Sequence, residues 1–178
     1  MKKLLSIFIS LTFSGLIALP MHQASASSCK PVEPVGKSIG RIKAGDVSLP
    51  IIYFTYPAGG AMKIQGSTKM VGLSNRHMPL SSQVGTSVLL WHINYNHCWN
   101  DLNILTNKDA GYQFTIIDEK GKSQKYELTK RYIINKGKYR TEWFDVVGPR
   151  KLLLVSCTGS FKDGHYTQNV VMIANPVN

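Results

Sequence analysis

Short runs of β-forming residues, separated by turn residues, follow one another along the chain, and this pattern limits the fold more than any other feature of the sequence. The turn signals include Ala44-Gly45-Asp46 and Gly148-Pro149. One short segment, Cys98–Leu105, is helix-like. Eight or nine short strands in a domain of about 140 residues predict an all-β fold, a closed or nearly closed β-barrel with short helical loops. The expected strands are Ile39–Lys43, Val47–Phe54, Ala61–Ile64, Lys69–Leu73, Ser87–Ile93, Tyr112–Ile117, Gln124–Ile134, Lys151–Cys157 and Tyr166–Ala174.

Two of these runs, Ser87–Trp91 and Leu152–Val155, are almost continuously apolar, which is typical of strands buried on both faces. Tyr112–Ile117 instead alternates apolar and polar residues, as a half-buried strand does. The chain is 43% hydrophobic, which is too apolar for a disordered protein. A single stretch approaches the length of a membrane span, and this excludes a multi-pass membrane protein.

Residues 1–26 have the anatomy of a secretory signal peptide: a positively charged start, an apolar stretch from Leu4 to Leu19, and a small-residue cleavage site at Ala24–Ala26. Two alternatives stay open. The apolar stretch is long enough to remain as an uncleaved membrane anchor, and Cys29 is open to lipidation, although Ala26 is a poor residue three places before a lipidated cysteine. In each case we expect export to the cell envelope, the periplasm or the extracellular space.

The rest of the chain is expected to form an extended lead-in and one domain. Residues 27–37 are rich in Ser, Pro and Gly, as an extended lead-in is, and residues 38–178 hold the strands of the barrel. The formal net charge is +11, and the basic residues are densest between Lys120 and Lys151, where aromatic residues are interleaved. This charge indicates either a solvated face or attraction to an anionic envelope. An exported chain seldom meets nucleic acid, so no nucleic-acid partner is expected.

Two residues at the ends of the most buried strands carry side chains suited to covalent chemistry. Cys157 follows the apolar run at residues 152–155, and His92 follows the one at 87–91. A thiol attacks as the thiolate, and a nearby imidazole can take its proton. The two residues are 157 − 92 = 65 positions apart, so only the fold can bring them together. The alternative is a buried structural cysteine and a core histidine.

The other histidines give weaker signals. His97 and Cys98 lie near His92 in sequence, and together with Cys157 they are a conceivable transition-metal set, but their spacing matches no recognised ligand pattern. We therefore expect no metal and no cofactor. His77 is expected in a loop.

Three segments of the chain carry motifs that are typical of one known family. The segment LLLVSCTGSFKDGHYTQNVVMIANP, Leu152–Pro176, is similar to the region around the sortase nucleophile, and most similar to class F, where an apolar strand ends in Thr-Cys-Gly-Gly and a Gly-His-Tyr-Arg-Asp-Asn-Val-Val run begins the last strand. Ser81–Leu105 resembles the family's Gly-x-x-Val-x-x-Gly-His strand, and Ser38–Ile51 resembles its opening strand pair. The segments occur in the family's order, and the resemblance implies the sortase β-barrel of about eight strands.

The resemblance also implies a mechanism, in which Cys157 attacks a substrate carbonyl, His92 supplies or receives the proton, and a thioacyl intermediate passes to an amine or to water. Sortases have an arginine on the last strand that stabilises the oxyanion or positions the substrate. No arginine follows Cys157 here. Thr167 stands where that arginine is expected, and it shares a strand face with Asn169 by alternation, so these two are our candidates for oxyanion or substrate contacts. Trp91 replaces a glycine before the histidine, where it narrows the cleft or packs in the core.

Three cysteines allow three pairings. Cys29–Cys98 leaves Cys157 free, and this pairing fits the sortase resemblance. Cys98–Cys157 silences the nucleophile or makes it redox-switchable, and Cys29–Cys157 brings the lead-in over the active site. His165 and Tyr166 match the family's run and are expected to shape the hairpin.

The resemblance implies an exported, monomeric cysteine transpeptidase or peptide hydrolase. Its partners would be a protein or peptide with a short sorting motif and an amine acceptor. The alternative is a catalytically weakened relative that serves as an envelope binding or assembly module, which the missing arginine favours. A thiol redox protein is a weaker third possibility, because the chain has no C-x-x-C motif.

Overall fold

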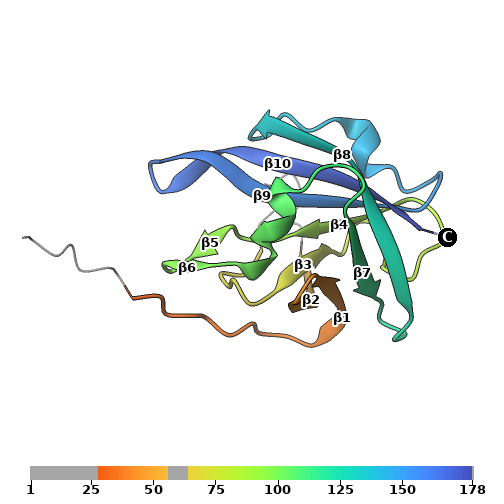
Figure 1. Cartoon of the computed structure of the whole chain (residues 1–178), viewed down its shortest axis with the longest axis horizontal. Coiled ribbons are helices and arrows are strands. Elements are labelled where there is room, and N and C mark those ends of the chain that lie inside the picture. Colours follow the sequence, from red (N-terminus) through yellow and green to blue (C-terminus); the bar gives the residue numbers. More distant parts are fainter. Residues whose placement is uncertain (1–27, 56–63, 178) are drawn as a thin grey trace, which may run out of the picture.

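The computed structural model describes residues 28–55 and 64–177. The barrel strands are β1 (Ser38–Ala44), β2 (Val47–Phe54), β3 (Val71–Ser74), β4 (Thr86–Leu90), β7 (Gln113–Ile117), β8 (Ser123–Asn135), β9 (Lys151–Lys162) and β10 (His165–Pro176). They close in the order β1-β2-β3-β4-β9-β10-β8-β7, with β7 pairing back onto β1 (Figure 1). The pairs β2–β3 and β4–β9 are parallel. The predicted all-β closed barrel of about eight strands is confirmed.

The strand predictions differ from the structure in a few places. The strand expected at Ser87–Ile93 ends at Leu90. The strand expected at Lys69–Leu73 begins two residues later, at Val71. The strand expected at Ala61–Ile64 falls outside the described residues except for Ile64, which belongs to no strand. The last two strands are longer than expected and form one long hairpin, which projects to the left in Figure 1.

The helical segment expected at Cys98–Leu105 is wrong for its first three residues. Cys98–Trp99 is strand β6, which pairs with β5 (Asn94–Tyr95) in a two-stranded hairpin. The helical segment is the 3-10 helix η1 (Asp101–Asn107). The Asn100 side chain caps it by accepting a hydrogen bond from the Leu102 backbone N–H at 2.9 Å, so the helix starts after the hairpin.

Two apolar clusters lie on the two faces of the central strands. Side chains from all eight barrel strands fill the interior, among them Leu89 on β4 and Leu154 on β9. The neighbouring residues point the other way and form the outer cluster, which the 3-10 helix η2 (Thr141–Phe144) covers. Both faces of β4 and of the first half of β9, Leu152–Ser156, are thus buried, as their apolar sequences predict. The outer cluster consists of Phe54, Val88, Leu90, Trp143, Leu153, Val155 and Val171, with Ile64, Tyr132, Ile134, Tyr139, Phe144 and Ile173 packed against it.

The lead-in is fastened to the β5–β6 hairpin. A disulfide joins Cys29 to Cys98, and next to it the Asn96 side chain donates a hydrogen bond to the Lys30 carbonyl at 2.7 Å. Further along, the Ser67 hydroxyl donates to the Val32 carbonyl at 2.6 Å. Cys157 is the one free cysteine of the described residues. Within 28–55 and 64–177, the structure contains no helix that is long and apolar enough to span a membrane.

Candidate active site

The parallel pairing of β4 and β9 brings His92 and Cys157 to the same end of the barrel. Thr86 stands opposite Lys151 and Leu90 opposite Val155, a constant offset of 155 − 90 = 65 positions. This offset equals the separation between His92 and Cys157. The pairing continues beyond the end of β4, because the Trp91 N–H donates to the Val155 carbonyl at 3.2 Å and the Ser156 hydroxyl donates to the Trp91 carbonyl at 3.1 Å. His92 therefore follows β4, whereas Cys157 lies within β9 at the equivalent register position, just after the buried residues of that strand.

Alternation directs both side chains to the outer face of the barrel. Val88 and Leu90 precede His92 in the outer cluster, and Leu153 and Val155 precede Cys157 there. Trp91 points the opposite way, into the interior, where only 2% of its surface is exposed. Its indole N–H donates to the Asn103 side-chain oxygen at 3.1 Å. Of the two roles expected for Trp91, packing in the core is the one that the structure shows.

The Cys157 thiol lies beside Asn169, its partner across the β9–β10 pair. The Asn169 amide group donates to the Ser156 carbonyl at 3.1 Å and lies 4.0 Å from Sγ of Cys157. Its carbonyl oxygen accepts a hydrogen bond from the Tyr139 hydroxyl at 3.1 Å. These contacts fix the amide orientation, so that its N–H groups face the sulfur.

Thr167 lies farther along the same strand, opposite a bulge. The register shifts between Tyr166 and Gln168, and Gly159 has a φ of 84°, a conformation that favours glycine. A Cβ at Gly159 would meet the Thr167 hydroxyl at 2.9 Å, so the hydroxyl lies against Gly159. Of the two donors expected from the sequence, Asn169 is the one with a contact to Cys157.

Burial controls the protonation of both reactive groups. Burial raises the pKa of the Cys157 thiol, and the positive charge of Lys136 partly opposes this rise. Burial lowers the pKa of His92, which favours the neutral imidazole. Hydrogen bonds from the ring to the backbone carbonyls of Ile64 and Gln65 oppose this shift, and the charge of Lys136 adds to it.

The two ring nitrogens of His92 have different surroundings. Among the described residues its buried Nε2 has no hydrogen-bond partner, so the carbonyls of Ile64 and Gln65 engage Nδ1. A ring that donates through Nδ1 keeps the lone pair of Nε2 free to accept a proton. The ring of Tyr95, from the β5–β6 hairpin, lies beside it with the ring centroids 5.5 Å apart.

Tyr166 lies near the thiol on the β10 side. The pKa of its phenol is raised first by burial and then by the nearby charge of Cys157, whereas a hydrogen bond with the Asn94 side chain acts in the opposite direction. Its ring packs edge-on against Phe161. Sequence analysis gave Tyr166 a role in shaping the hairpin only, and it did not single out Tyr139. The aromatic residues interleaved in the basic stretch were the available signal for Tyr139.

The remaining histidines lie elsewhere. His165 is exposed at the tip of the β9–β10 hairpin, and His97 occupies the β5–β6 turn with a φ of 61°. His77 hydrogen-bonds through Nδ1 with the Ser74 hydroxyl at 2.7 Å. Cys98 is bound in the disulfide. No group of three or more His, Cys, Asp or Glu side chains is arranged to hold a metal ion in the part of the chain that the structure describes.

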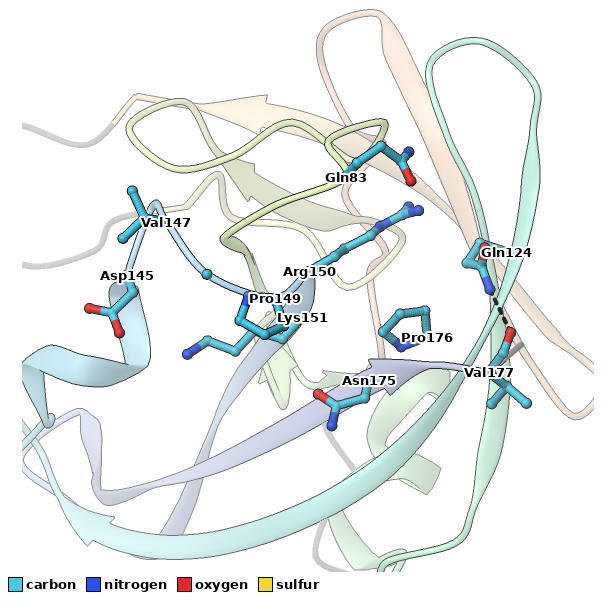
Figure 2. Close-up of a pocket in the computed structure, with 11 residues that line it drawn as sticks. Gln83, Gln124, Asp145, Val147, Pro149, Arg150, Lys151, Asn175, Pro176 and Val177 are labelled. Atoms are coloured by element: carbon cyan, nitrogen blue, oxygen red, sulfur yellow. Dashed lines mark hydrogen bonds between the residues drawn. The ribbon is translucent and has the colours of Figure 1, made fainter.

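An open pocket lies at the other end of the barrel. It is bordered by the segment that leads into β9, including Arg150, and by the end of β10 with Pro176 (Figure 2). The Arg150 guanidinium is already engaged, because it donates to the Leu80 carbonyl at 2.7 Å. The pocket is lined by neither Cys157 nor His92.

The structure is a closed eight-stranded barrel that carries a thiol and an imidazole at equivalent register positions on its outer face. The chain matches the family described as sortase domain over residues 41–177. It belongs to the sortase family.

Solved structures show the same fold. Sortase A from Corynebacterium diphtheriae superposes with a TM-score of 0.61 at 16% identity, covering 80% of this chain and 61% of that one. Sortase C from Clostridium perfringens SM101 gives 0.58 at 17% identity, with 80% and 71% covered. The pilus-related sortase C of Group B Streptococcus gives 0.62 at 17% identity, with 82% and 70% covered. This chain thus spans about three fifths of the length of the first of these proteins. No curated protein matches it in sequence.

Proposed function

We propose that this protein is an exported cysteine transpeptidase or peptide hydrolase of the class F type, acting on a short sorting motif of other exported proteins. The observation that carries the proposal is the parallel register of β4 and β9, whose offset equals the separation of His92 and Cys157. The family match supports the reaction class, and the motif around Cys157 supports the class F type.

The chemistry begins at the thiol. Cys157 transfers its proton to Nε2 of His92, and the thiolate attacks the scissile carbonyl carbon to form a C–S bond. The resulting oxyanion collapses, the C–N bond breaks, and the imidazolium donates its proton to the departing amine. An acceptor amine then attacks the thioester while His92 takes a proton from it, and the thiol is released with the new amide. Water in place of the amine gives hydrolysis.

Asn169 is proposed to act on the sulfur. Its amide N–H groups face Sγ at 4.0 Å and stabilise negative charge there, while the Tyr139 hydroxyl holds the amide in this orientation. We assign Thr167 to substrate contacts near the bulge, because its hydroxyl lies against Gly159 rather than the thiol.

We propose that residues 1–26 direct export and either are removed or remain as an anchor, and that the protein works as a monomer at the cell envelope. These assignments come from the sequence of the leader and from the family.

The test is a covalent trap. Purified protein is incubated under reducing conditions with a library of short peptides, and mass spectrometry searches for a thioacyl adduct on Cys157. The adduct is expected on the wild type and not on Cys157→Ala, and His92→Gln should reduce its rate by two or more orders of magnitude. A correctly folded protein whose thiol alkylates but forms no adduct with any peptide would instead support the binding-module alternative.

A further inference from the structure

The backbone of Lys136 continues the pairing of β8 with β10 beyond the end of β8. Asn135 stands opposite Gln168 and Ile134 opposite Asn169. The Lys136 N–H donates to the Thr167 carbonyl at 3.5 Å, which continues this register by one residue. Lys136 is therefore the cross-strand neighbour of Thr167, two residues from the partner of Cys157.

Alternation gives Lys136 the same face as the thiol. Tyr132 and Ile134 pack against the outer cluster, so the residue two positions after Ile134 continues that row. Asn169, which faces Sγ of Cys157, lies on the β10 strand in the same layer, opposite Ile134. The β8 row therefore ends in a cation at the edge of the candidate active site.

We propose that Lys136 is the cation of this active site, a positioning residue that stabilises the Cys157 thiolate and the negative charge that develops beside it. The catalytic meaning of this assignment rests on the proposed function, whereas the effect on the thiol does not. A half-buried thiol needs a nearby positive charge to ionise near neutral pH, because burial alone favours the protonated form.

The charge of Lys136 acts on both partners in a recognisable way. It lowers the pKa of the Cys157 thiol and also that of the His92 imidazole, since a positive charge favours the thiolate and disfavours the imidazolium. Among the described residues, Tyr166 on β10 also lies near Cys157, and Tyr139 contacts Asn169. The raised pKa of Tyr166 keeps its phenol neutral near pH 7.

Alkylation of the thiol tests the proposal without any peptide substrate. The rate of reaction of Cys157 with iodoacetamide is measured against pH for the wild type, Lys136→Met and Lys136→Arg. We expect Lys136→Met to slow alkylation at pH 7 by about two- to fivefold and to move the profile to higher pH, whereas Lys136→Arg retains the wild-type profile. Because Lys136 is exposed, 1 M salt should remove most of the difference between wild type and Lys136→Met.

Lys138 offers a matched control, since it is an exposed lysine in the same loop and does not shift the pKa of either reactive group. Lys138→Met should alkylate at the wild-type rate. The proposal is overturned if the Lys136→Met profile superposes on that of the wild type, or if Lys138→Met shifts the profile equally.

A second measurement separates electrostatics from a structural defect. In an NMR titration, the imidazole of His92 should titrate at higher pH in Lys136→Met than in the wild type, because the removed cation disfavoured the imidazolium. A displaced loop would not be expected to raise the titration midpoints of both Cys157 and His92. An unchanged titration midpoint for His92 contradicts the proposal. If Lys136→Met slows alkylation but no peptide forms a thioacyl adduct, the proposed function is wrong and this inference stands. If adducts form at the same rate in the wild type and Lys136→Met, this inference is wrong and the proposed function stands.

Discussion

Asn169 stands directly opposite Cys157 across the β9–β10 pair, and its side-chain nitrogen lies 4.0 Å from the sulfur. The amide is held from both sides, because it donates to the Ser156 carbonyl and accepts from the Tyr139 hydroxyl. The Cys157 thiol thus has an uncharged, oriented hydrogen-bond donor beside it on the neighbouring strand.

Replacing Asn169 should affect stability and thiol reactivity together. Asn169→Ala leaves the buried Ser156 carbonyl without its side-chain partner, and we expect a loss of about 1–3 kcal/mol in the free energy of unfolding, measured by urea denaturation. Alkylation of Cys157 at neutral pH should slow, because the thiolate loses its donor. Tyr139→Phe is the matched control: it removes one hydrogen bond, costs about 0.5–1.5 kcal/mol and keeps the amide. Equal thiol reactivity in wild type and Asn169→Ala would argue against the contact.

Two half-buried histidines should make the protein less stable in mild acid. The pKa values of His92 and His77 are lowered from 6.5, mainly because burial disfavours the charged ring. The unfolded chain therefore binds protons more readily than the folded one, and the free energy of unfolding should fall as the pH drops below about 6.5 towards the folded-state values. Urea denaturation between pH 7.5 and 5 measures this slope, and His92→Gln should flatten it. A slope that is the same in both proteins would exclude a contribution from His92.

Trp91 should behave as a core residue. Its side chain is 2% exposed and lies in the barrel interior, so Trp91→Ala should lower the free energy of unfolding by about 3–5 kcal/mol. Trp99 is 63% exposed, and Trp99→Ala should change it by no more than about 0.5 kcal/mol. Chemical denaturation of the two variants side by side decides between core packing and a cleft wall, because a cleft-wall indole would cost little stability.

The disulfide should leave a single reactive thiol. Cys29 and Cys98 are bonded across a separation of 69 residues, so unreduced protein that retains Cys29 should titrate with one thiol-specific group, which Cys157→Ala removes. Cys29→Ser should lower the free energy of unfolding by about 2–4 kcal/mol, because the unfolded chain regains the freedom of a long loop. Two or more thiols in the unreduced native protein would contradict this pairing.

Local sequence patterns predicted the positions of the strands well, but they did not predict which strands pair with one another. The apolar runs Val88–Leu90 in β4 and Leu152–Val155 in β9 are visible in the sequence because both faces of each strand are buried there. Their parallel pairing joins segments about 65 positions apart, and such a register is set by the whole barrel rather than by either run. The sequence therefore indicated His92 and Cys157 as separate candidates, and only the family resemblance predicted that they lie together.

The errors have local causes. Cys98 looked helical because it precedes Leu102 and Leu105, whose side chains are buried in the interior. The turn before it has two residues with positive φ, Asn96 and His97, and this reverses the chain into a hairpin first. Lys136 was one basic residue among many in a charged stretch, because its relation to the thiol arises only when β8 lies beside β10.

The shared offset of β4 and β9 also sets what can change in this protein without loss of the site. The loops between the two strands can lengthen or shorten, because the register is fixed by the ladder, but β7 and β8 also lie in this interval and must keep their pairings. A single residue inserted between Val155 and Cys157 has a different effect. Strand alternation would turn the sulfur towards the barrel interior, and Asn169 would then face another residue in place of Cys157. Length variation among relatives should therefore concentrate in the loops and spare the two-residue steps from Leu90 to His92 and from Val155 to Cys157.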